Sequence, residues 1–126
     1  MKAIVTILAT PDEVASALLD EKYRIQWDTG LLKMTKQASK EEMAKFEYDK
    51  NYLEMVKTHC ERHENRFFIQ EYVNADFYRY FILERLENRP DFLRVTMYTK
   101  VSPEAHEKRG RDTYRSLQML KTFISM

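Results

Sequence analysis

Residues 66–85 read RFFIQEYVNADFYRYFILER, and this stretch decides the fold. Two runs rich in Phe, Tyr and Ile flank a short NAD segment, whose residue types favour a turn. A three-residue loop pairs Val73 with Phe77, and the same count places Glu71 opposite Arg79. Each pair matches in kind, as cross-strand neighbours prefer. The stretch therefore predicts an antiparallel hairpin with an ion pair between Glu71 and Arg79.

A second hairpin continues the predicted sheet. With ENRPD as its loop, Leu86 pairs with Phe92 and Glu84 with Arg94. Because side chains alternate along a strand, this register divides them between two faces. One face is predicted to form the interior and carries Phe67, Ile69, Val73, Phe77, Phe81, Leu83, Val95 and Met97, with Glu71 and Arg79 among them. The outward face carries Tyr78, Tyr80, Ile82, Thr96 and Tyr98, with Glu84 and Arg94.

The N-terminal part predicts one strand and two short helices. Residues 3–9, AIVTILA, are apolar and β-branched, which is typical of a strand. The next residues, TPDE, carry a capping box with Pro at the first helical position. EKYRIQWD predicts a second short helix or a turn, and Gly30 is expected to end it. We expect Trp27 to close one end of the core at this point.

Residues 31–63 carry weaker signals, and residues 40–63 are ambiguous between strand and helix. LLKMTKQ and AKFEYDK alternate weakly, as strands do, whereas the apolar residues of NYLEMVKTHCER also fit one helix face. A hairpin with HEN at its tip joins this segment naturally to the strand that begins at residue 66. A strand is therefore the prediction, and a helix within residues 40–63 is the alternative.

The chain ends in a predicted long helix. Ser102 is the expected N-cap and Pro103 the first helical residue. An amphipathic pattern gives this helix an apolar stripe of Thr113, Tyr114, Leu117, Leu120, Phe123 and Ile124. Residues 1–126 are thus predicted to form a single α+β domain. It has a curved antiparallel sheet of six to seven strands wrapped around the C-terminal helix, with two short helices after the first strand.

Composition argues against several classes of protein. The 126 residues include 21 basic and 20 acidic ones, so the net charge of +1 indicates neither nucleic-acid binding nor more than transient membrane contact. A single cysteine, Cys60, excludes an internal disulfide. The N-terminal apolar run is too short for a signal peptide or a membrane span. We therefore expect a cytoplasmic protein.

Metal and catalytic signals are weak. On a helix, His59 and His63 would share a face with zinc-binding potential, but in a strand and turn they would diverge from each other and from Cys60. We predict no metal and no cofactor. The three histidines show no arrangement beside a nucleophile. Glu71 would suit a general base only if it were buried without its partner, so no catalytic residue is assigned and binding is favoured over catalysis.

In its order of elements, nearly the whole chain resembles the helix-grip superfamily of START domains and birch-pollen-allergen-like proteins. The similar residues are TPDEVASALLDEKYRIQWD, in which a Pro-initiated helix leads to Trp27 and Asp28, and FLRVTMYTKVSP before the last helix. The chain is similar to the minimal birch-pollen-allergen-like core more than to a full START domain. Members of this superfamily enclose an apolar cavity between the sheet and the C-terminal helix, and they carry sterols, phospholipids or other hydrophobic molecules.

The resemblance implies binding or transfer of a hydrophobic small molecule, and the expected ligand is a lipid or sterol held in a cavity between the sheet and the C-terminal helix. The predicted ligand-binding residues are Trp27, Phe67, Ile69, Glu71, Arg79, Phe81, Leu83, Val95, Met97, Tyr114, Leu117 and Leu120. The Glu71–Arg79 pair is read either as a structural ion pair or as a group that orients a polar part of the ligand. The alternative function is a protein-interaction module without ligand, which forms a homodimer through Tyr78, Tyr80, Ile82 and Tyr98.

Overall fold

The computed structural model describes residues 2–37, 40–49, 51–75, 77–101 and 113–124. Its elements in chain order are β1 (Lys2–Leu8), α1 (Pro11–Leu19), α2 (Glu21–Trp27), β2 (Leu31–Gln37), β3 (Lys40–Tyr48), β4 (Tyr52–Arg62), β5 (Arg66–Asn74), β6 (Phe77–Arg85), β7 (Phe92–Val101) and α4 (Thr113–Ile124). The ambiguous segment is therefore two strands, β3 and β4. The helix start expected at Ser102 and Pro103 lies outside the described residues.

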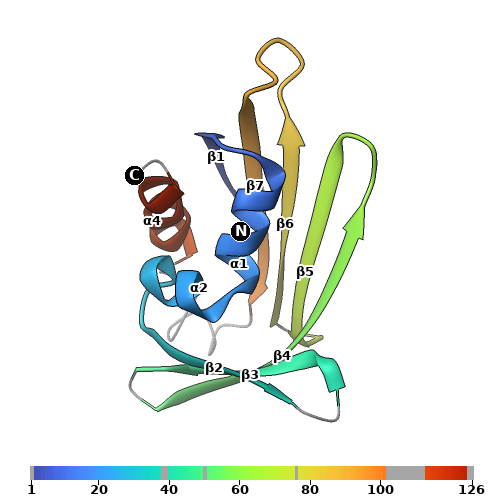
Figure 1. The fold of residues 1–126 in the computed structure, drawn as a ribbon. Helices are drawn as coiled ribbons and strands as arrows, with labels where there is room; N and C mark the ends of the chain where they lie inside the picture. The colour runs from blue at the N-terminus through green and yellow to red at the C-terminus, as the bar shows by residue number, and fades with distance from the viewer. Residues whose placement is uncertain (1, 38–39, 50, 76, 102–112, 125–126) are drawn as a thin grey trace.

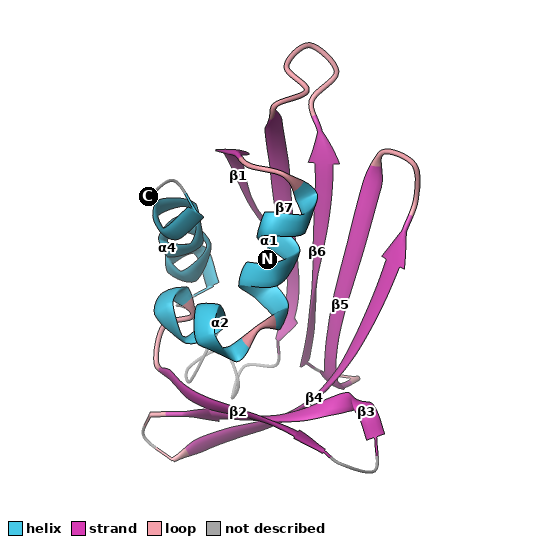
Figure 2. Cartoon of the chain, in the orientation of Figure 1, coloured by secondary structure: helices cyan, strands magenta, loops and turns pink. Residues whose placement is uncertain are grey.

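The strands form one antiparallel sheet in the order β1-β7-β6-β5-β4-β3-β2. The sheet is strongly curved: β2 and β3 cross beneath the helices, while β7 stands behind α1, with β6 and then β5 to its right (Figure 1). The described helices lie together on the concave side (Figure 2). This is the helix-grip fold that the sequence predicts. No helix in the described ranges has the length and apolar character needed to cross a membrane.

Local sequence signals explain how the short helices begin and end. The Thr10 hydroxyl accepts a hydrogen bond from the Glu13 amide at 3.2 Å, and the Glu13 carboxylate accepts one from the Thr10 amide at 3.4 Å. This is the predicted capping box. Asp20 caps α2 by accepting a hydrogen bond from the Lys22 amide at 3.0 Å. Gly30 follows with a φ of 82°, a left-handed conformation that suits glycine.

The predicted strand register is confirmed with one local correction. Glu71 pairs with Arg79 and Glu84 with Arg94, as predicted. The predicted inward side chains are buried or partly buried, and of the predicted outward ones Thr96 alone is buried, at 5% exposed. The predicted pairing of Val73 with Phe77 is wrong, because Asn74 occupies that place. A register shift between Tyr72 and Asn74 inserts one extra residue, as a β-bulge does, without disturbing the pairs further along the hairpin.

Most of the interior is an apolar core between the helices and strands β1 and β5–β7. It includes Ile7, Val14, Leu18, Trp27, Ile69, Phe81, Leu83, Leu93, Val95, Met97, Leu117 and Leu120, each at most 3% exposed. The described part of α4 packs against β1, α2 and α1. The Trp27 indole donates a hydrogen bond to the Ala17 carbonyl at 2.8 Å, so the tryptophan joins α2 to α1 inside this core.

Candidate functional site

Five charged side chains are buried beside the apolar core, and we call them the charged network: Arg24, Asp28, Glu54, Glu71 and Arg79. Each is at most 4% exposed. They come from α2, the residue after it, and strands β4, β5 and β6. Buried charges are costly to desolvate unless they are paired and hydrogen-bonded. The contacts within the network therefore decide whether this part of the fold is stable.

Arg24 is the centre of the network. Its Nη1 and Nη2 donate to the two carboxylate oxygens of Glu71 at 2.7 and 2.9 Å, in a bidentate pair. Its Nε donates to Asp28 at 2.8 Å, and Nη1 also donates to the Leu18 carbonyl at 2.9 Å. The guanidinium carbon lies 4.8 Å from the centre of the Trp27 ring. One side chain thus joins α1, α2 and the sheet.

Arg79 holds the other side of the network. Its Nε donates to Glu71, which confirms the predicted ion pair, and its Nη2 donates to Glu54 at 3.1 Å. The Tyr48 hydroxyl donates to Asp28 at 3.2 Å. Glu71 therefore lies between two guanidinium groups, one from α2 and one from β6.

This environment fixes the ionisation of Glu71. Burial acts to raise its pKa, but the charges and hydrogen bonds of Arg24 and Arg79 outweigh that effect and lower the pKa from 4.5 to about 2. Burial acts to lower the pKa of Arg24, but Glu71 and Asp28 raise it above its ordinary value. An anionic Glu71 with both oxygens engaged by arginines is a poor general base. The arrangement favours binding over proton transfer.

A pocket of about 460 Å³ opens beside the network, between α1 and strands β2–β5. Half of its twelve lining residues are apolar: Leu18, Leu19, Met34, Met43, Ala44 and Phe46. Strand β4 adds Thr58, His59 and Cys60, and β5 adds Glu71. Lys36 and Glu42, both exposed, also line the pocket. A volume of this size, with apolar walls and a few polar groups, is typical of a small-molecule site.

The thiol of Cys60 belongs to this pocket and has a shifted ionisation. Partial burial raises its pKa, and the negative charges of Glu71 and Glu42 add to the effect. A thiol with a raised pKa is a weak nucleophile at neutral pH. Within the described ranges, no group of three or more His, Cys, Asp or Glu side chains could hold a metal ion.

The predicted ligand-binding residues fall into two groups. Glu71 lines the pocket, and Arg79 donates a hydrogen bond to Glu71 without lining the pocket itself. The others whose side chains are described pack in or against the apolar core: Trp27, Phe67, Ile69, Phe81, Leu83, Val95, Met97, Leu117 and Leu120. The side chain of Tyr114 lies outside the described part of the chain. A ligand between the sheet and α4 stays a prediction.

Sequence reasoning missed Arg24 and Glu54, although each left a signal. Arg24 and Asp28 are four residues apart on a predicted helix, the spacing at which an Arg and an Asp meet. Glu54 is in phase with Val56 along β4, so alternation places it inward. Neither pattern alone reveals that both residues converge on the Glu71–Arg79 pair. That convergence depends on how α2 docks against the curved sheet.

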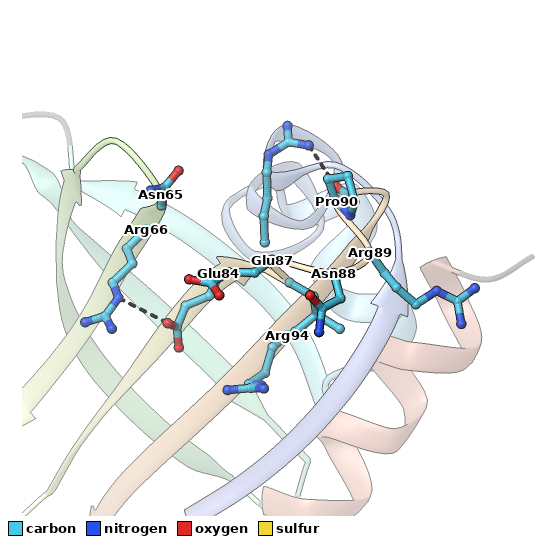
Figure 3. A pocket seen from close by; sticks show the side chains of 10 residues that line it. Asn65, Arg66, Glu84, Glu87, Asn88, Arg89, Pro90 and Arg94 are labelled. Atoms are coloured by element: carbon cyan, nitrogen blue, oxygen red, sulfur yellow. Dashed lines mark hydrogen bonds and ion pairs between the residues drawn. The ribbon is translucent and has the colours of Figure 1, made fainter.

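The outward face carries the tyrosines that the sequence predicts. Tyr80 and Tyr98 stack with their ring centres 5.0 Å apart, and Tyr78, Tyr80, Ile82 and Tyr98 are all partly exposed. A second hollow, of about 840 Å³, lies at the β6–β7 hairpin, and its charged side chains point in several directions (Figure 3). There Arg66 pairs with Glu84 at 3.1 Å. Self-association through the tyrosines stays a prediction.

Comparison with known proteins supports the fold. No protein-family model matches the chain, and no curated protein matches it by sequence. Solved structures do match. A conserved protein of unknown function from Enterococcus faecalis is 14% identical, with a TM-score of 0.68 over 99% of this chain and 70% of that one. A hypothetical protein from Helicobacter pylori is 15% identical, with a TM-score of 0.63 over 99% of this chain and 83% of that one.

One similar structure is an enzyme. A point mutant of norcoclaurine synthase from Thalictrum flavum, in complex with a transition-state analogue, is 9% identical, with a TM-score of 0.58. The match covers 98% of this chain and 92% of the synthase. At such low identity these likenesses establish a shared fold, and they do not establish a shared activity.

Proposed function

We propose that the protein binds a hydrophobic small molecule, such as a lipid or sterol fragment, in the pocket beside Glu71. The observation that carries the proposal is the pocket of about 460 Å³, with apolar walls and a buried carboxylate at one side. Apolar walls provide affinity through desolvation of the ligand, and a few fixed polar groups orient it.

The charged network supports this proposal because it pre-organises the polar side of the pocket. Arg24 and Arg79 hold the Glu71 carboxylate in one position from two directions. A group that is already fixed loses little conformational freedom when a ligand binds. The helix-grip fold and the resemblance to START and birch-pollen-allergen-like domains, which carry hydrophobic molecules, favour the same function.

Cys60 provides a direct test because it is the only cysteine of the chain and lines the pocket. The rate of its alkylation by iodoacetamide is measured by mass spectrometry at fixed pH, with and without 1-naphthylmethanol. This probe is apolar and neutral, so it leaves the electrostatics of the thiol largely unchanged. We expect alkylation to slow progressively, with a plateau, as the probe concentration rises.

A matched control moves the thiol to the other face of the same strand. Leu53 lies on β4, is 56% exposed and does not line the pocket. In the double variant Cys60→Ser with Leu53→Cys, the probe should leave the alkylation rate unchanged. Equal rates for wild-type Cys60 without the probe and at its highest soluble concentration, together with no detectable binding of the probe by calorimetry, would refute the proposed function.

A further inference from the structure

The pocket adjoins a third hollow, at the surface near the two N-terminal helices. That hollow, of about 750 Å³, lies between α1, the start of α2 and β2. The two share Leu19, Met34 and Lys36 in their walls, so they adjoin each other, and together we call them the groove. One hydrogen bond joins two sides of this hollow: the backbone amide of Met34 on β2 donates to the carboxylate of Glu21 on α2 at 2.7 Å.

Negative charge predominates along this groove. Its lining side chains include five carboxylates, from Asp12, Asp20, Glu21, Glu42 and Glu71, against the single ammonium group of Lys36. Two of the five are paired with arginines: Asp12 with Arg62 at 2.8 Å, and Glu71 with Arg24 and Arg79. The chain as a whole has a net charge of +1, so the acidic character is local to the groove.

The charged network behind the pocket leaves this balance unchanged. Besides Glu71, which is already counted in the groove, it contains two carboxylates and two guanidinium groups, so their formal charges sum to zero. Glu71 is the member that reaches the pocket. Among the described side chains, Arg24 is the donor to its Oε2, and a carboxylate oxygen has lone pairs for two hydrogen bonds. The pocket thus has in its wall an anionic carboxylate that Arg24 and Arg79 hold in place.

On the premise of the proposed function above, we propose that the ligand is a hydrophobic amine, bound as its ammonium form. The ammonium group lies toward Glu71 and Glu42, and the apolar body fills the space between α1 and β3. A ligand carboxylate would instead meet like charge in a site partly shielded from water. A neutral alcohol would gain the hydrogen bond without the charge attraction.

Three probes of matched shape test the proposal: 1-naphthylmethylammonium, 1-naphthylmethanol and 1-naphthoate. Dissociation constants are measured by calorimetry at pH 7 and low ionic strength. We expect the ammonium probe to bind about tenfold more tightly than the alcohol, and the carboxylate to bind most weakly. Raising the salt to about 0.5 M should reduce the ammonium advantage, because exposed charges are screened.

Substitution of an exposed lining residue separates the contribution of charge to ligand affinity from the contribution of packing. Glu42→Gln should weaken binding of the ammonium probe about threefold and leave the alcohol unchanged. The control Glu87→Gln removes the same charge at the exposed β6–β7 hairpin and should change neither. Neither residue belongs to the buried network, so folding is expected to be preserved.

The outcomes distinguish this inference from the proposed function. If all three probes bind equally, or if the carboxylate binds best, the amine assignment is wrong while hydrophobic-ligand binding stands. If none binds, both fail. If Glu87→Gln weakens binding of the ammonium probe as much as Glu42→Gln does, the preference for the ammonium reflects the overall charge of the protein. That result would overturn the assignment to this pocket.

Discussion

The apolar core and the charged network lie side by side inside one small domain, yet they are built on different principles. Leu117, Leu120 and Val95 are fully buried by close packing of hydrocarbon. Glu71 is equally buried, but two arginines surround it and a pocket adjoins it. Packed hydrocarbon stabilises a fold without specifying a ligand. A paired carboxylate contributes less to stability, and it offers a defined polar contact to whatever enters the pocket.

The largest loss of stability should come from removing Arg24, the centre of the charged network. Arg24→Met leaves Glu71 and Asp28 buried without their main partner, so the free energy of unfolding should fall by about 3–5 kcal/mol. Urea denaturation followed by circular dichroism measures it. Arg62→Met is the matched control, because Arg62 pairs with Asp12 on the surface with 59% and 81% of the two side chains exposed. That variant should lose less than about 1 kcal/mol.

A cavity in the apolar core should cost stability through a different mechanism. Leu120→Ala removes a fully buried side chain of α4, and we expect a loss of about 2–4 kcal/mol. Met119→Ala changes the next residue, which is 42% exposed, and should alter stability by no more than about 0.5 kcal/mol. Neither change should alter the affinity of the pocket for 1-naphthylmethanol. A large loss of affinity in Leu120→Ala would place the ligand beneath α4 instead.

The smallest expected effect is the contribution of Glu71 to the pH dependence of the free energy of unfolding. The pKa of Glu71 is about 2 in the folded protein, below its ordinary value of 4.5. The unfolded chain therefore takes up a proton first as the pH falls, and the stabilisation by Glu71 is complete above about pH 4.5 and lost toward pH 2. The contribution of this one group has a slope of up to about 1.4 kcal/mol per pH unit within that window.

Urea denaturation at a series of pH values measures this slope. Glu71→Gln should flatten it, whereas Glu87→Gln, at an exposed position, should keep it. A carboxyl resonance of Glu71 that titrates near its ordinary value in a carbon-13 NMR experiment would contradict the pairing described for the network.

Much of the fold could be predicted because its signals are local. The TPDE capping box, the alternation within each strand and the loop lengths of two hairpins set the helix start and the register of β5, β6 and β7. The bulge at Val73 escaped because it lies at the end of β5, where only Asn74 follows and no further residues show the break in alternation. Cross-strand pairing revealed Glu71 and Arg79, but only tertiary packing brings Arg24 and Glu54 to them.

The pocket could not be predicted either, because it too depends on tertiary packing. Its walls come from α1 and four strands, and its position depends on how the β2–β3 end of the sheet curves beneath the helices (Figure 1). The resemblance placed the ligand between the sheet and the C-terminal helix. The described structure adds a second candidate place, nearer to α1 and β3, which no alternation pattern indicates.

The most direct test of the central claim, that a hydrophobic molecule binds beside Glu71, is NMR mapping with uniformly labelled protein and 1-naphthylmethanol. We predict that the amide shifts change in a saturable manner at Ala44, Thr58 and Cys60, all of which line the pocket. The amides of Leu117 and Leu120 in the apolar core should change little. Changes confined to those two residues and their neighbours, or no saturable changes anywhere, would contradict the account.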